Sequence, residues 1–151
     1  MRDVDKYMEE KKKMVESCMV LGMLGIESFQ DIKKHRIGVW LICAFGICGA
    51  ICHMLHQKGE YQSLLGGMAI GLAMILVSVA TQGKVGLGDG MVLFVTGIFL
   101  GFRKNLVLFT MSQALASVYA LFLLVVRKKD RNHEFAYLPF LLISYVGMLA
   151  V

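Results

Sequence analysis

Six apolar runs separated by short polar links constrain this sequence more than any other feature. They cover residues 14–30, 37–56, 62–82, 90–102, 105–126 and 136–151. A helix needs about 20 residues to cross a bilayer core of about 30 Å. The run at 90–102 reaches that length only if the glycine-rich residues before it are partly embedded. Because a backbone that faces lipid must pair its own N–H and C=O groups, the runs predict an all-α membrane protein, a polytopic bundle of about six transmembrane helices.

The composition leaves little room for structure outside these helices. Apolar residues make up 57% of the 151 residues, above the roughly 45–50% that is usual in soluble domains. Six spans use about 120 residues, so about 30 remain for a tail and five links. We therefore expect a charged N-terminal tail at 1–13, a six-helix membrane domain at 14–151 and no separate soluble domain.

The net charge of +5 is distributed as in a membrane protein. The cations lie in short clusters between the apolar runs, so we expect the lipid bilayer as a partner and no nucleic acid. The links after the first, third and fifth runs carry eight Lys and Arg residues, and the opposite links carry three. This bias favours a cytoplasmic position for the end of the first run. Five cations in the tail at 1–13 oppose that orientation, so charge alone leaves it nearly undecided.

The cysteines and two histidines offer ligand atoms without a metal-binding motif. The cysteines lie inside apolar runs without a CxxC pair, and we expect them to act as small hydrophobic residues. His53 and His56 lie beside Cys52, but a tetrahedral site needs three or four converging ligands. We interpret this cluster as interfacial and predict no metal site.

Two aspartates are the strongest candidates for chemistry. Asp31 ends the first apolar run and Asp89 begins the fourth, so both lie on the same side of the bundle. An acidic residue in or beside a spanning helix is costly and points to function. Two close carboxyls share a proton, so one acts as general base toward a water and the other as general acid, as in aspartic proteolysis. The alternatives are that Asp89 only caps the fourth helix and that Asp31 pairs with Lys34 or His35.

Four nearby residues are candidates for supporting roles. Gly86 and Gly88 let the backbone approach the second aspartate and an extended substrate. Glu27 lies four residues before the first aspartate on one helix face, where it either tunes that aspartate or pairs with a polar group inside the bundle. Lys84 either favours the charged form of a nearby carboxyl or only marks the cytoplasmic side.

Three segments resemble the type IV prepilin peptidases, a family of GxGD intramembrane aspartyl peptidases. The segment GLGD, at 86–89, resembles the GxGD signature at the start of a helix. The segment SFQDIKKHRIG, at 28–38, resembles the family's first half-site, where an aspartate ends the first helix before a basic stretch. The segment FAYLPFLLISYV, at 135–146, resembles the family's late apolar segment around a Pro-Phe-Leu core.

This resemblance implies both an activity and its residues. Family members remove a short basic leader peptide from type IV prepilins or pilin-like precursors at the cytoplasmic face of the cell membrane, without a metal or organic cofactor. The matching catalytic residues are Asp31 and Asp89. The chain looks like the short peptidase-only form, because the domain with paired CxxC motifs that is associated with N-methylation is absent. Gly38 departs from the family pattern, which usually has proline there.

A different class of function remains as the alternative. A small non-enzymatic membrane scaffold, or a subunit of a proton- or cation-coupled transporter, would use Asp31, Glu27 and Asp89 as an ion path. Inverted repeats would support that alternative, and the sequence has no convincing one. The sequence does not identify which precursor is cleaved, and it does not indicate an oligomeric state.

Overall fold

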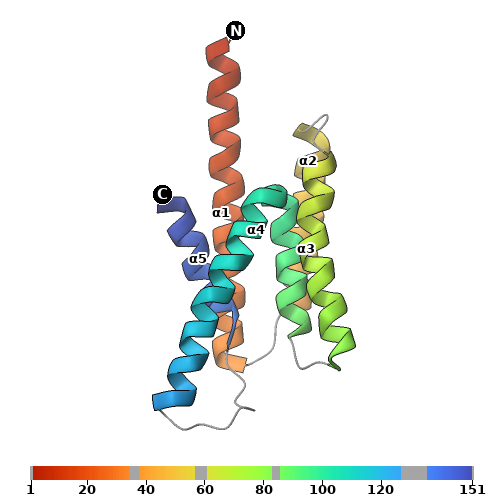
Figure 1. The fold of residues 1–151 in the computed structure, drawn as a ribbon. Helices are drawn as coiled ribbons and strands as arrows, with labels where there is room; N and C mark the ends of the chain where they lie inside the picture. Colours follow the sequence, from red (N-terminus) through yellow and green to blue (C-terminus); the bar gives the residue numbers. More distant parts are fainter. Residues whose placement is uncertain (1, 35–37, 57–60, 83–85, 127–135, 151) are drawn as a thin grey trace.

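The described part of the chain contains helices and no strands. The computed structural model describes residues 2–34, 38–56, 61–82, 86–126 and 136–150. Its helices are α1 (Arg2–Lys34), α2 (Val39–His56), α3 (Tyr61–Ala80), α4 (Leu87–Val126) and α5 (Leu138–Ala150) (Figure 1). This confirms the predicted all-α class.

Helix α4 reverses direction within its length. Gly101 has φ +69° and ψ −178°, a backbone conformation that glycine adopts without the steric cost of a Cβ. The chain rises from residue 87, turns over and descends toward residue 126 (Figure 1). The described residues therefore contain six helical segments, one for each apolar run. The break falls at Gly101 itself, whereas the sequence pattern placed it at the charged link that begins with Arg103.

Buried polar contacts hold the reversal together. The Asn105 carboxamide donates to the carbonyl oxygens of Gly67 and Leu93, each at 3.0 Å, and the Thr96 hydroxyl lies 2.9 Å from Asn105 Oδ1. At the exposed edge of the reversal, Phe102 N donates to Ser63 Oγ at 3.4 Å. Asn105 is fully buried. Because buried polar groups are costly when unpaired, this set of bonds favours one packing of α3 against α4.

Glycines bring α3 and α4 into backbone contact. A Cβ on Gly67 would collide with the Gly97 carbonyl, and a Cβ on Gly97 would collide with the Gly67 backbone. A Cβ on Gly71 would likewise collide with the backbone of Phe94. These positions belong to the two small-xxx-small patterns of the sequence, Gly67 to Gly71 and Gly97 to Gly101. The close helix approach that such spacing permits is present here.

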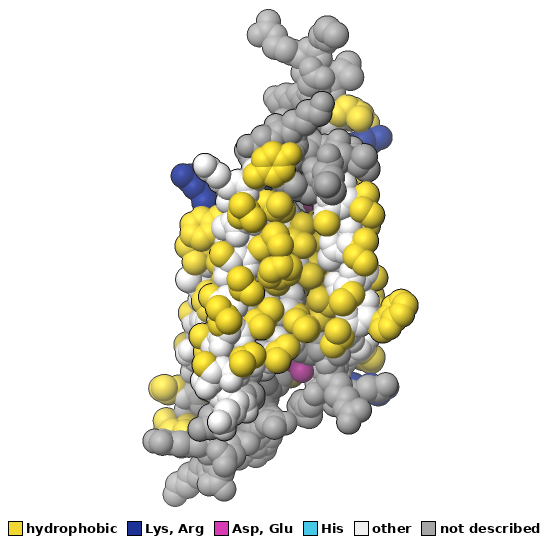
Figure 2. All heavy atoms as spheres, turned by 90° about the vertical axis from the view of Figure 1, so that its right-hand side faces the viewer, with side chains coloured by type: hydrophobic (Ala, Val, Ile, Leu, Met, Phe, Trp, Pro, Cys, Tyr) yellow, Lys and Arg dark blue, Asp and Glu magenta, His cyan; other side chains and the backbone are white. Residues whose placement is uncertain are grey.

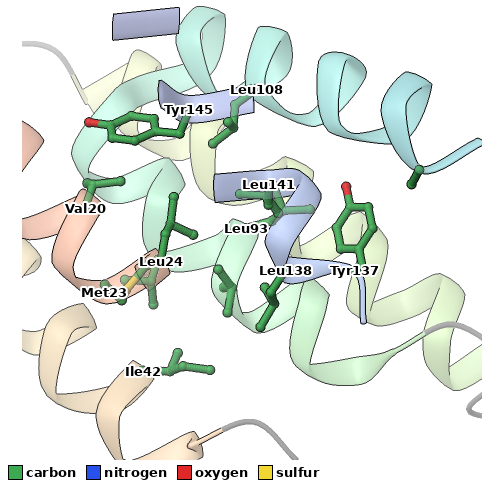
Figure 3. Close-up of a cluster of buried hydrophobic side chains, with 13 residues drawn as sticks. Val20, Met23, Leu24, Ile42, Leu93, Leu108, Tyr137, Leu138, Leu141 and Tyr145 are labelled. Carbon is green, nitrogen blue, oxygen red and sulfur yellow. The ribbon is translucent and has the colours of Figure 1, made fainter. Parts of the chain in front are cut away.

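A hydrophobic core joins α1, α4 and α5 and receives one side chain from α2. Its members come from these helices and from the residue before α5, and Figure 3 labels Val20, Met23, Leu24, Ile42, Leu93, Leu108, Tyr137, Leu138, Leu141 and Tyr145. Tyr145, Met23 and Leu24 are among its largest fully buried side chains. This core fixes the first helix against the last one, far apart in the sequence.

The outer surface is apolar over the middle of the molecule. Hydrophobic side chains cover the face shown in Figure 2, and Lys and Arg side chains lie toward its two ends. Trp40 is 89% exposed, and many other large apolar side chains face outward. In the part of the chain that the structure describes, two helices are long and apolar enough to cross a membrane, Tyr61–Ala80 and Leu87–Val125, and the second contains the reversal. Such a surface favours a membrane protein.

The charged tail continues directly into the first helix. Helix α1 begins at Arg2, so residues 2–13 are helical together with the first apolar run. Its N-terminal half projects beyond the other helices (Figure 1). The domain boundary at residue 13 stays a prediction.

Candidate active site

The two candidate aspartates lie at the same end of the bundle. Asp31 is in the last turn of α1 and Asp89 is in the first turn of α4. Both helix ends point to the lower end of the molecule in Figure 1. The carboxyls are close enough to interact electrostatically. The fold therefore brings together two acids that are far apart in the sequence.

Asp31 is held by the start of α5. Its side chain is 8% exposed, and its Oδ2 accepts a hydrogen bond from Leu138 N at 3.2 Å. The first backbone N–H groups of a helix have no partner inside the helix, so they are free to bind a carboxylate. This bond orients the Asp31 carboxyl, and its donor, Leu138, lies 107 positions later in the sequence.

Asp89 lies against the glycine turn that precedes it. Asp89 N donates to the Gly86 carbonyl at 3.2 Å, and a Cβ on Gly86 would lie 2.5 Å from Asp89 Oδ2. Gly86 therefore leaves space for the carboxyl in its present place. The position of Asp89 in the first turn is also favourable for a negative charge, because the helix dipole is positive there. Capping and catalysis are compatible at this residue. Gly88 is half-buried within the same turn.

A buried tyrosine completes the polar surroundings of the pair. Tyr137 Oη lies 2.6 Å from Ser112 Oγ. Since the Ser112 hydroxyl donates to the Phe109 carbonyl at 2.9 Å, Tyr137 is the donor in its bond with Ser112. Burial raises the pKa of Tyr137 to about 12, with a further contribution from the nearby Asp89 charge. Tyr137 is therefore neutral at any physiological pH.

The sequence pattern did not identify this tyrosine or its serine partner. Tyr137 lies two residues before Pro139, inside the segment at 135–146, which was the only local signal for this region. Ser112 lies in the middle of a long apolar run and is fully buried. Neither residue type predicts a pairing across 25 positions.

Of the other candidate residues, the structure describes Glu27 and leaves Lys84 outside the described residues. Glu27 is fully buried one turn before Asp31, and its Oε2 accepts a hydrogen bond from Gly38 N at 3.0 Å. This contact pairs Glu27 with a polar group inside the bundle, and Glu27 also interacts electrostatically with Asp31. Both predicted roles therefore remain. Lys84 and His35 lie outside the described residues, as do the side chains of Lys34, His53 and His56.

The arrangement provides two acids of different surroundings at one end of the bundle. Asp31 is buried with a backbone donor, and Asp89 is half-buried beside a glycine turn. Carboxyls that lie close together do not ionise independently of each other. A carboxyl and a carboxylate at one site are the groups that activate a water and protonate a carbonyl.

Comparison with known families identifies one family whose model covers most of the chain. The model of the type IV leader peptidase family matches residues 18–121, which include Asp31 and Asp89. The match ends before the segment at 135–146, which contains Tyr137 and Pro139. Searches of curated proteins and of solved structures found no significant match. Since the family match covers more than half of the sequence, the chain belongs to the type IV leader peptidase family.

Proposed function

We propose that this protein is an aspartic endopeptidase in which Asp31 and Asp89 form the catalytic pair. Family membership supports a leader peptidase in general. The observation that supports the aspartic mechanism is that the two aspartates lie at the same end of the bundle, one in the last turn of α1 and the other in the first turn of α4. Six transmembrane segments within residues 14–151 would hold this pair at the cytoplasmic face of the cell membrane.

The proposed reaction uses one proton shared between the two carboxyls. The ionised carboxyl takes a proton from a water, whose oxygen bonds to the scissile carbonyl carbon. The other carboxyl gives its proton to the carbonyl oxygen, which forms a tetrahedral intermediate. When that intermediate collapses, one of its two hydroxyls returns a proton to the ionised carboxyl, the C–N bond breaks, and the leaving nitrogen takes up a proton from the other carboxyl, so the pair again holds one proton. The leader leaves as a carboxylate, and no metal or organic cofactor takes part in these steps.

The substrate we propose is a type IV prepilin or a pilin-like precursor. Such a precursor presents a short basic leader next to an apolar helix, so its cleavage site lies at the membrane surface. The candidate site is also at an end of the bundle, beside an apolar outer surface (Figures 1 and 2). Gly86 and Gly88 would give an extended substrate strand room beside Asp89.

Leader removal in cells tests this function. The protein and a candidate precursor are coexpressed, and the shortening of the precursor is followed on a gel. Asp31→Asn and Asp89→Asn should each abolish cleavage, because an amide cannot exchange the required proton. Asn keeps the shape of the side chain and an oxygen that accepts the Leu138 N–H bond. Both variants should therefore remain in the membrane at wild-type levels.

The same experiment separates the peptidase from the alternative. A scaffold or an ion-coupled transporter subunit would leave the precursor uncut with the wild-type protein, across precursors of several pilus and secretion systems. Undiminished cleavage by either Asn variant would contradict the catalytic pair even though the protein is a peptidase.

A further inference from the structure

Glu27 is a buried carboxyl that the proposed reaction does not use. Its side chain is fully buried in α1, one turn before Asp31. Oε2 accepts the hydrogen bond from Gly38 N at 3.0 Å, and Oε1 is buried without a hydrogen-bond partner among the described residues. A carboxyl in such a place is costly. Because an apolar residue would fill the position at a lower cost in free energy, the buried carboxyl itself indicates a role.

Gly38 is shaped to receive this carboxyl. Its carbonyl accepts from Leu41 N at 2.8 Å and from Ile42 N at 3.1 Å, so it begins the first turn of α2. A Cβ on Gly38 would lie 3.0 Å from Gln30 Oε1 and 3.3 Å from Glu27 Oε1, which is tighter than ordinary contact. Glycine thus permits the close approach, and its N–H supplies the donor. A proline here would have no N–H.

Two hydrogen bonds from neighbouring elements hold the end of α1 around Asp31. On one side, the Glu27 bond ties the start of α2 to α1. On the other side, Leu138 N ties the start of α5 to Asp31 itself. Helix α1 ends at Lys34, only three residues after Asp31, and the last turn of a helix lacks a full set of internal bonds. Contacts from neighbouring elements must therefore define where the Asp31 carboxyl lies.

We propose that Glu27 is a positioning residue for the peptidase reaction. The hydrogen bond that it accepts from Gly38 N fixes the end of α1 and so holds the Asp31 carboxyl in its place relative to the Asp89 carboxyl. This inference rests on the proposed function. In this proposal Glu27 acts through Asp31 and does not contact the substrate. It also gives a reason for glycine at position 38, whose N–H is the donor and whose lack of a side chain leaves room for the Glu27 carboxyl.

Cleavage kinetics of the full-length protein in detergent test the proposal. Glu27→Leu removes the acceptor and keeps much of the volume, and we expect kcat to fall about 10-fold or more with KM within about 2-fold, because misplaced catalytic groups lower the rate of the chemical step. Glu27→Gln keeps an oxygen that accepts the Gly38 N–H, so it should retain most of the wild-type kcat. Gly38→Pro removes the donor and should lower kcat in the same way. The double variant Glu27→Leu/Gly38→Pro should be no slower than the slower single variant, since both changes remove one bond.

The controls separate this proposal from loss of folding and from the proposed function. Thermal unfolding of each variant checks the fold, and Glu10→Gln, an exposed change on the same helix, should match the wild type. If Gly38→Pro does not fold, the Glu27→Leu and Glu27→Gln pair carries the test. A folded Glu27→Leu protein with wild-type kcat overturns the positioning role alone, and so does a Glu27→Gln protein as slow as Glu27→Leu. Wild-type activity in Asp31→Asn overturns the proposed catalytic pair instead.

Discussion

The two ends of this bundle treat buried polar groups in opposite ways. At the α3–α4 reversal, Asn105 uses both carboxamide hydrogens and its oxygen in bonds within the protein. At the other end, the Asp31 and Glu27 carboxyls each accept a hydrogen bond from a backbone N–H, and Glu27 Oε1 has no hydrogen-bond partner among the described residues. A polar network whose hydrogen bonds are all made fixes one structure. Buried acids with unsatisfied hydrogen-bond acceptors are costly, and they are found mainly at functional sites. The contrast separates the structural end of the molecule from its candidate active end.

The largest effect on stability should come from the backbone contact near the reversal. Gly97→Leu would place a side chain into the backbone at Gly67, so we expect α3 and α4 to separate at a cost of about 3 kcal/mol. Thermal unfolding in detergent measures this loss. Gly147→Leu is the matched control, because Gly147 has open space around its Cβ position. Equal stability of the two variants would show that the close approach does not hold the helices together.

A smaller loss should follow when the satisfied network is broken. Asn105→Leu leaves the Gly67 carbonyl and the Thr96 hydroxyl without their Asn105 partner, and we expect about 2 kcal/mol of destabilisation. Cleavage activity of the protein that remains folded should be close to that of the wild type, since none of the network's hydrogen bonds involves either aspartate. Loss of activity without loss of stability would break the division between the two ends.

At the candidate active end the order of effects should reverse. Gly86→Ala would place a Cβ 2.5 Å from Asp89 Oδ2 and displace the carboxyl, so we expect kcat to fall about 10-fold. The melting temperature should change little, because Gly86 is exposed. Gly22→Ala in α1, with nothing within 4 Å of the added Cβ, is the control. A wild-type kcat for Gly86→Ala would mean that the position of the Asp89 carboxyl is not limiting.

The smallest effect concerns the Tyr137 hydroxyl. Tyr137→Phe loses the bond to Ser112 and should cost about 1 kcal/mol of stability. The pKa of Tyr137 is about 12 in the folded chain and about 10 in an unfolded one, so the native state favours the neutral form. The wild type should therefore lose part of its stability above about pH 10, and Tyr137→Phe should lose less. Equal pH dependence of the two unfolding curves in that range would contradict the buried position of Tyr137.

The sequence predicted the helical class and the side of the bundle on which both aspartates lie. It succeeded because apolar runs report helices and because consecutive spans alternate in direction. It misplaced the reversal, since nothing local distinguishes Gly101 from the glycines that pack inside helices. It also missed Tyr137 and Ser112 and the bond between Glu27 and Gly38. These contacts join residues on different elements, and their pairing depends on tertiary packing that a single sequence does not encode locally.

The most direct test of the central claim is the cleavage rate of purified wild-type, Asp31→Asn and Asp89→Asn proteins on one precursor in the same detergent. We expect each variant to lose activity by about 1,000-fold or more, with an unchanged melting temperature. The double variant should be no slower than either single variant, because the two carboxyls act as one unit. A folded single variant that retains the wild-type rate would contradict the account.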